Sequence, residues 1–202
     1  MTSGRLRARP ERAIARTLFL ALALATVPVA AGAFDMAELM ALMGRVEQSR
    51  VAFEETKNVA ALTAPIVRRG TLRYVRPDRL EMRVETPYFE RMDIAGNVLM
   101  IETKRGTRQI DLAAAPALAA WVAAIRATLA GDRPTLARHF AFELSGQASR
   151  WTLALLPIDP ALSGVIARIA IDGAQSQVLR IEVDERMGDT TVLVVQPGTG
   201  AR

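Results

Sequence analysis

The sequence contains no cysteine, a single histidine (His139) and few aromatic residues, which make up 5% of its 202 positions. The absence of cysteine excludes thiol catalysis, cysteine-bound zinc and disulfide bonds. A serine–histidine triad would have to use His139, to which we assign a structural role instead. We therefore expect no catalytic residue, no metal and no cofactor, and a fold that depends on its apolar core.

Glycine-rich phosphate loops and calcium loops are also missing from the sequence. Asp172-Gly173 and Gly188-Asp189 lack the alternating oxygen ligands of a calcium loop, and we interpret them as turns. Carboxylate pairs, which could act as acid and base, occur at Glu54-Glu55 and at Glu81 and Glu85. Because Glu81 and Glu85 alternate with apolar residues, we expect them on the outer face of a sheet, where they have no catalytic role.

The first 33 residues are basic and then apolar. Five arginines and one glutamate in this segment supply four of the five net positive charges of the chain, so the remainder is nearly neutral and nucleic-acid binding is not expected. The apolar run Leu18–Val29 is shorter than the about 20 residues that span a bilayer, and Ala31-Gly32-Ala33 fits a cleavage site before Phe34. We interpret residues 1–33 as a cleaved Sec signal peptide, with an uncleaved N-terminal anchor as the alternative, and residues 34–202 as a single periplasmic domain.

The stretch Arg69–Pro87 organises the rest of the chain. From Arg79 to Glu85, three apolar residues alternate strictly with four charged ones, which predicts an antiparallel strand with one buried face. The preceding Gly70–Val75 is rich in β-forming residues, and Arg76-Pro77-Asp78-Arg79 supplies a turn, so the two strands form a hairpin. Two further strands are predicted at Glu90–Ala95 and Val98–Thr103, joined by a tight turn at Gly96-Asn97.

Two amphipathic helices are predicted. The first begins at a capping-box-like Asp35 and Glu38 and extends to about Ser49, and the second, Pro116–Ala130, is rich in alanine and ends at Gly131. Further strands are predicted at Val51–Leu62, Arg108–Leu112, Phe140–Leu144, Trp151–Leu156, Ala167–Asp172, Val178–Glu185 and Thr190–Val195, with short helices at Pro134–His139 and Pro160–Val165. Because this order lacks regular strand–helix alternation, we predict an α+β fold with helices on one face of a mostly antiparallel sheet.

The run from Gly70 to Leu99 carries a family likeness: a strand that ends in Arg-Pro, a second strand, Thr-Pro, and a hairpin that turns at a glycine. With the signal peptide, the Met- and Leu-rich helix and the later W-x-L-x-L strand, the chain resembles the LolA family of periplasmic lipoprotein carriers. The resemblance implies an incomplete, half-open antiparallel β-barrel with a helical lid over an apolar cavity. It also implies that Arg76 holds the lid closed. The lipid-binding cavity would be formed by Leu72, Tyr74, Leu80, Met82, Val84, Trp121, Ile125, Leu129 and Trp151.

This resemblance implies a periplasmic carrier, without enzymatic activity, that binds acyl chains of a lipoprotein or another lipid and ferries them toward the outer membrane. Its partners would be an inner-membrane donor and an outer-membrane acceptor, and we expect a monomer. Two alternatives remain open at this point. One is a periplasmic lipid- or lipoprotein-sensing regulatory or interaction module of the same fold. The other is a lipid enzyme that uses His139 or an acid pair.

Overall fold

The computed structural model of the protein describes residues 34–196, which lie within one compact unit. The predicted signal peptide and its cleavage site lie outside the described residues, as does the tail after Gln196. Within the described part of the chain, no helix has both the length and the apolar character needed to cross a membrane.

A single antiparallel sheet makes up most of the fold. Its strands are β1 (Gln48–Asn58), β2 (Ile66–Val75), β3 (Arg79–Thr86), β4 (Glu90–Ala95), β5 (Val98–Thr103), β6 (Gly106–Asp111), β7 (Phe140–Gln147), β8 (Arg150–Pro157), β9 (Ile166–Ala174), β10 (Gln177–Glu185) and β11 (Thr190–Gln196). Their spatial order is β6-β5-β4-β3-β2-β1-β11-β10-β9-β8-β7, so β6 and β7 are the edges and the sheet does not close into a barrel. The predicted α+β fold with an incomplete antiparallel barrel is therefore confirmed.

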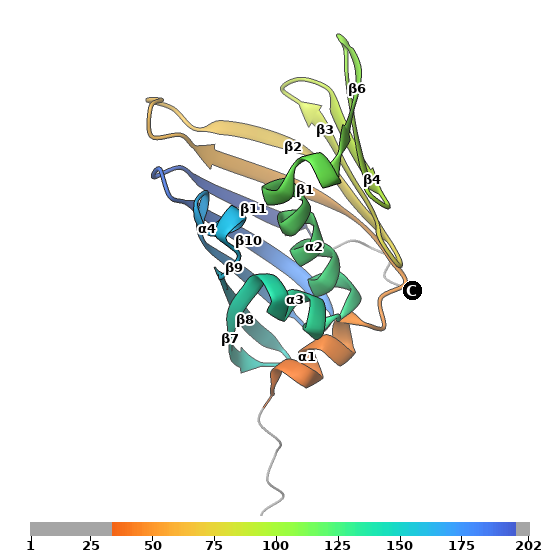
Figure 1. Cartoon of the computed structure of the whole chain (residues 1–202), viewed down its shortest axis with the longest axis vertical. Coiled ribbons are helices and arrows are strands. Elements are labelled where there is room, and N and C mark those ends of the chain that lie inside the picture. Colours follow the sequence, from red (N-terminus) through yellow and green to blue (C-terminus); the bar gives the residue numbers. More distant parts are fainter. Residues whose placement is uncertain (1–33, 197–202) are drawn as a thin grey trace, which may run out of the picture. The chain divides into compact units, whose positions relative to one another are not determined.

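The helices are α1 (Met36–Met43), the short 3-10 helix η1 (Leu112–Ala114), α2 (Pro116–Ala130), α3 (Arg133–His139) and α4 (Pro160–Ser163). Helices α1, α2 and α3 lie on the concave side of the curved sheet (Figure 1). The Asp35 side chain accepts a hydrogen bond from the Glu38 amide at 2.9 Å, as the capping pattern predicts. Helix α2 has its predicted bounds, because Gly131 ends it with a φ of 71°, a left-handed conformation that favours glycine.

Helix α1 is shorter than predicted. We expected it to reach about Ser49, but it ends at Met43, and β1 begins at Gln48. The apolar periodicity that includes Val46 was misleading, because the carbonyl of Gly44 finds a hydrogen-bond partner outside the helix, the Arg76 guanidinium. The four buried residues of the helix, Met36, Leu39, Met40 and Met43, are all apolar.

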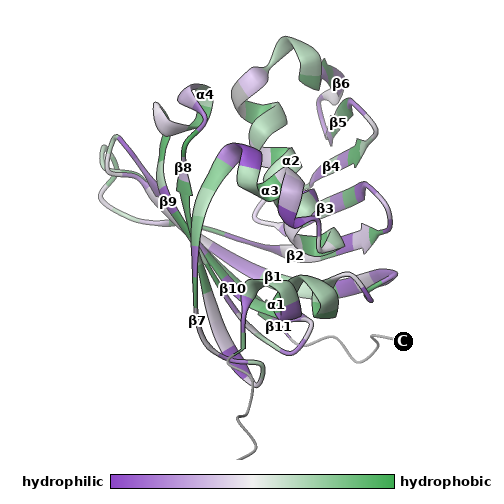
Figure 2. Ribbon diagram, turned by 60° about the horizontal axis from the view of Figure 1, so that its bottom comes forward, coloured by the Kyte–Doolittle hydropathy of each residue, from purple (hydrophilic) through white to green (hydrophobic). Residues whose placement is uncertain are grey.

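The strand register fixes which side chains face the helices. Directly opposed residues of neighbouring antiparallel strands lie on the same face, and one such row crosses β2 to β5 through Leu72, Met82, Met92 and Ile101. The predicted charged positions of β3 lie on the other face, where the Arg79 guanidinium bonds Asp93. Figure 2 shows the same alternation of apolar and polar residues along the strands.

The main core lies between the helices and strands β7 to β10. Trp151, Leu153 and Leu155 of β8 are each no more than 1% exposed. A Cβ atom at Gly173, on the neighbouring β9, would lie 2.1 Å from the Trp151 ring, so the position requires glycine. The indole Nε1 donates to the Gln175 carbonyl at 2.9 Å, which satisfies the one polar atom of this buried ring.

Candidate functional site

The half of the sheet formed by β2 to β6 keeps part of its apolar inner face accessible. The row Leu72, Met82, Met92 and Ile101 is only half-buried, although it lies on the concave face toward the helices. A fully packed core would bury such side chains completely. The helices therefore cover this part of the sheet incompletely, and an apolar surface remains that another apolar group could contact.

The predicted cavity residues occupy three different environments. Tyr74 and Val84 are on the inner face but are 2% and 1% exposed, respectively. Trp151 is buried in the main core beside Gly173. The remaining residues are half-buried, three on the inner face of the sheet and three on α2: Leu72, Leu80, Met82, Trp121, Ile125 and Leu129.

Helix α2 turns mainly small side chains toward the core. Ala120, Ala124 and Ala127 are no more than 5% exposed and pack within the main cluster. The larger Trp121 and Leu129 are only partly buried against that cluster. Because small residues allow close packing, the helix lies close against the main cluster, while Trp121 and Leu129 stay at its margin.

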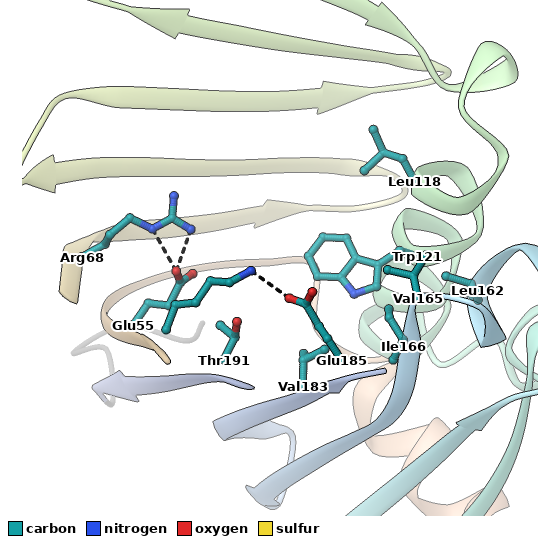
Figure 3. A pocket seen from close by; sticks show the side chains of 11 residues that line it. Glu55, Arg68, Leu118, Trp121, Leu162, Val165, Ile166, Val183, Glu185 and Thr191 are labelled. Carbon is teal, nitrogen blue, oxygen red and sulfur yellow. Dashed lines mark hydrogen bonds and ion pairs between the residues drawn. The ribbon is translucent and has the colours of Figure 1, made fainter. Parts of the chain in front are cut away.

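A pocket of about 350 Å³ lies between the end of the sheet and the first turns of α2 (Figure 3). This volume is at the lower end of the roughly 300–1,000 Å³ typical of ligand sites. Trp121 is the predicted cavity residue that lines it. Its apolar wall consists of Leu118, Trp121, Leu162, Val165, Ile166 and Val183.

The opposite end of the pocket is charged. Glu55 accepts hydrogen bonds from Arg68 Nε and Nη2 at 2.8 and 2.6 Å, and Lys57 Nζ donates to Glu185 at 2.8 Å. The Glu55 side chain is 7% exposed, and the other three side chains are 26–32% exposed. The pocket is therefore amphiphilic, with an apolar wall next to two ion pairs.

Arg76 joins the C-terminal ends of two helices. Its Nη2 donates to the carbonyl of Gly44, the C-cap of α1, and to that of Ala130, the last residue of α2, the latter at 3.3 Å. Its Nε donates to the Val46 carbonyl at 3.4 Å. A cation at helix C-termini satisfies orphan carbonyls and interacts favourably with both helix dipoles. Arg76 is thus placed where it can hold α1 and α2 together, and we call this contact the Arg76 clamp.

Tyr74 lies two residues before the clamp on the inner face of β2. No partner for its buried hydroxyl is found in the described part of the chain. Burial raises the pKa of this phenol, and the charge of Arg76 partly opposes the shift. The hydroxyl therefore remains protonated at neutral pH and keeps its hydrogen-bond donor.

His139 links the end of α3 to the start of α4. Its Nδ1 lies 3.0 Å from Asp159 Oδ2, and the other oxygen of Asp159 accepts from the Ala161 amide at 2.8 Å. The hydrogen bond with His139 is the main reason that the pKa of Asp159 is lowered, followed by the Ala161 amide. We therefore keep the expectation of a structural role for His139.

Asp159→Asn is expected to remove part of the acid sensitivity of the folded state. Because the pKa of Asp159 is lower in the folded protein, its carboxylate stabilises the fold above the ordinary value of 3.8 and loses this effect as the pH falls below it. Urea unfolding at pH 6 should show the wild type to be more stable than the variant, and the difference should shrink toward pH 3. A stability difference of the same size at both pH values would contradict this assignment.

The charged end of the pocket lies outside the cavity that the sequence predicts. Glu55 was considered only as a possible acid or base together with Glu54, yet it shares its parity on β1 with the buried Phe53. That alternation was the available signal, since residues two apart on a strand face the same side. Lys57 is two positions after Glu55 on β1 and therefore lies on the same face of the sheet. Glu185 gave no local signal, because it is 128 positions away from Lys57.

Comparisons with known proteins identify the family to which this chain belongs. No curated protein matches it. Solved structures with a similar arrangement include a LolA superfamily protein from Nitrosomonas europaea, which is 12% identical, with 82% of this chain and 93% of that chain covered and a TM-score of 0.44. The lipoprotein LppX of Mycobacterium tuberculosis is 11% identical, with 81% and 98% covered and a TM-score of 0.38. The family described as "Outer membrane lipoprotein carrier protein LolA-like" matches residues 28–200. Because this match covers most of the sequence, the chain belongs to the LolA-like family of outer membrane lipoprotein carrier proteins.

Proposed function

We propose that the protein binds the acyl chains of a lipoprotein or another lipid on the concave face of its sheet and carries them through the periplasm toward the outer membrane. The observation that carries this proposal is the half-buried apolar row Leu72, Met82, Met92 and Ile101 beneath an incomplete helical cover. Burial of apolar chains is worth roughly 0.8 kcal/mol per methylene group. Even a partly inserted acyl chain would therefore bind well.

The carrier needs no catalytic residue in this proposal. Transfer from an inner-membrane donor to an outer-membrane acceptor would depend on the difference in lipid affinity among the three proteins and between the open and closed forms of the carrier. The predicted cavity residues of β2, β3 and α2 would contact the chains. The Arg76 clamp would favour the closed form and would open when lipid enters between the helices and the sheet.

Native mass spectrometry of the mature protein purified from periplasm, combined with lipid extraction, tests the proposal. We expect a stoichiometric acyl-containing species, which would also define the class of cargo. A ligand-free mass, together with no uptake of added lipopeptide or phospholipid, would overturn the carrier proposal and favour a closed core with a sensing or interaction role.

Met82→Gln is expected to weaken acyl-chain binding about fivefold, because it places an amide on the apolar inner face, where lipid would desolvate it. Met100→Gln is the matched control, since Met100 lies on the outer face of β5 and is 46% exposed. The binding of a fluorescent fatty acid to both variants gives the comparison. Equal affinities for the two variants would remove the row that contains Met82 from the proposed site.

A further inference from the structure

We propose that the charged end of the pocket binds an ethanolamine phosphate head group, with the phosphate on Arg68 and Lys57 and the ammonium on Glu55 and Glu185. This inference rests on the proposed function and narrows its substrate class to an amphiphile with a zwitterionic head, such as phosphatidylethanolamine. The acyl chains would lie along the apolar wall of the pocket.

Burial is the first observation that points to a ligand. Glu55 lies on the concave face between Phe53 and Lys57, and its side chain is 7% exposed. A buried ion pair often stabilises a fold no more than well-packed apolar residues would. Four partly or fully buried charges beside an apolar wall are therefore not required by the sheet, and their position in a pocket suggests recognition.

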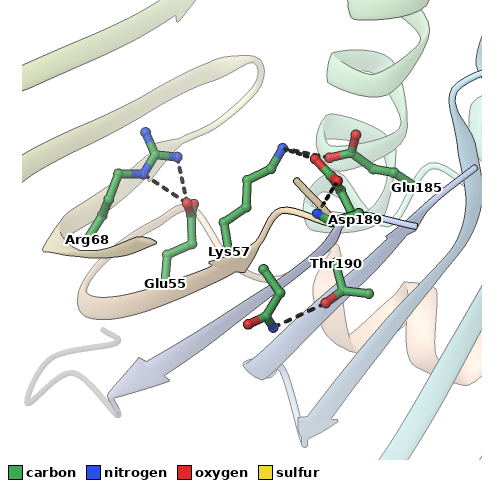
Figure 4. A network of polar contacts seen from close by, with 8 residues as sticks. Glu55, Lys57, Arg68, Glu185, Asp189 and Thr190 are labelled. Atoms are coloured by element: carbon green, nitrogen blue, oxygen red, sulfur yellow. Dashed lines mark hydrogen bonds and ion pairs between the residues drawn. The ribbon is translucent and has the colours of Figure 1, made fainter. Parts of the chain in front are cut away.

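The charge balance selects the type of head group. Glu55 and Glu185 are matched by Arg68 and Lys57, and Asp189, 3.8 Å from Lys57, adds one more negative charge (Figure 4). An anionic ligand would compete for the two cations and leave Glu55 buried without a countercharge, which is costly. A zwitterion brings one charge of each sign, so both members of each ion pair gain a partner and the single excess negative charge is the same with and without the ligand.

The donors and acceptors indicate ethanolamine rather than choline. Arg68 uses Nε and Nη2 on a single oxygen of Glu55, and its remaining nitrogen points away from that carboxylate in Figure 4. A guanidinium in this position suits a phosphate, which accepts several hydrogen bonds. A primary ammonium donates hydrogen bonds to carboxylates, whereas the quaternary ammonium of choline has no N–H group and is bound best by aromatic cages. Trp121 is the one aromatic residue among those that line the pocket.

The apolar wall next to these charges fits a lipid rather than a free head group. Trp121 and Leu118 from α2 and Val183 from β10 line the same pocket as Glu185 and Arg68. A volume of about 350 Å³ suits the head group and the first part of its chains. The rest of each chain could then continue beneath α2.

Binding of four dihexanoyl lipids below their micelle concentrations tests this head-group site. Isothermal titration should show that phosphatidylethanolamine binds about tenfold more tightly, or ~1.4 kcal/mol, than phosphatidylglycerol or uncharged dihexanoylglycerol. Phosphatidylcholine should be several-fold weaker than phosphatidylethanolamine. In the double variant Glu55→Gln/Arg68→Met, the preference should fall to within twofold while dihexanoylglycerol binds as before. Removing both partners leaves no unpaired buried charge from this pair, so the variant should fold.

The neighbouring ion pair provides a matched control. Arg69 Nε donates to Glu54 at 2.6 Å one position along the same two strands, on the outer face. The variant Glu54→Gln/Arg69→Met should keep the tenfold preference. A loss of preference in this control as large as in the inner pair would overturn the assignment to the pocket.

The remaining outcomes separate this inference from the proposed function. Equal binding of all four lipids by the wild type would overturn the head-group site and leave acyl-chain binding intact. If no lipid binds, including dihexanoylglycerol, both proposals fail. An affinity for phosphatidylcholine equal to that for phosphatidylethanolamine would overturn the role of the primary ammonium. Free phosphoethanolamine that binds as tightly as the dihexanoyl lipid would overturn the lipid as the source of the head group.

Discussion

Arg76→Leu is expected still to take up lipid and to release it to acceptor membranes at least tenfold more slowly than the wild type. The guanidinium of Arg76 bonds the terminal carbonyls of α1 and α2, and hydrogen bonds that involve a charged group contribute about 1.5–3 kcal/mol. Under the proposed gate role, loss of the clamp would destabilise the closed, ligand-free form more than the open, lipid-bound form. Because the apparent affinity depends on the fraction of protein that is competent to bind, lipid binding becomes tighter and release becomes slower.

Transfer of a fluorescent lipid from the loaded protein to vesicles measures this effect. Arg73→Leu is the matched control, since Arg73 is exposed on the outer face of the same strand, β2. We expect its transfer rate to equal that of the wild type. Unchanged transfer by Arg76→Leu would refute the gate assignment, and weaker lipid uptake by that variant would show that Arg76 contacts the cargo instead.

Strand β3 and the long helix could be predicted from the sequence because each has a strong local signal. Alternation from Arg79 to Glu85 identified β3 and its buried face, and the alanine-rich segment between Pro116 and Gly131 identified α2. The end of α1 could not be predicted in the same way. It depends on Arg76, which reaches Gly44 from a position 32 residues later in the chain.

The composition of the pocket depends on contacts over still longer distances. Lys57 meets Glu185 because β11 pairs with β1 on one side and with β10 on the other. The end of β10 therefore lies near the end of β1. Strand parity places Glu55 and Lys57 on the inner face of β1, whereas the cavity predicted from the sequence contains no charged residue. Charged residues on an apolar face therefore merit the same attention as the apolar ones.

The clamp and the pocket lie at opposite ends of α2. Ala130, at the last turn, accepts the hydrogen bond from Arg76, whereas Leu118 and Trp121, in the first two turns, line the pocket. A helix of 15 residues is about 22 Å long. Under the proposed function, a lipid that contacts Trp121 would therefore act on the end of α2 that lies opposite the Arg76 clamp.

Gly131→Ala is expected to lower the free energy of unfolding by about 3 kcal/mol. A Cβ at this position would lie 2.1 Å from the Met40 carbonyl oxygen and 2.9 Å from the Gly44 amide nitrogen, so α1 and α2 could not keep their present approach. These neighbours are backbone atoms and cannot rotate away. The left-handed φ of 71° adds a penalty for any residue with a side chain. A lower midpoint of urea unfolding, with an unchanged dependence of the unfolding free energy on urea concentration, measures this loss.

Gly96→Ala separates the backbone penalty of a positive φ from the steric contact between the helices. Gly96 also has a positive φ, 54°, but no atom lies within 4 Å of the place that a Cβ would occupy, so only the backbone penalty of about 1 kcal/mol applies. The difference of about 2 kcal/mol between the two variants then reports the steric contact between α1 and α2. Equal losses in the two variants would show that the helices separate at little cost. In that case the junction next to the Arg76 clamp would be a loose hinge, and the slow release expected for Arg76→Leu would have to come from another contact.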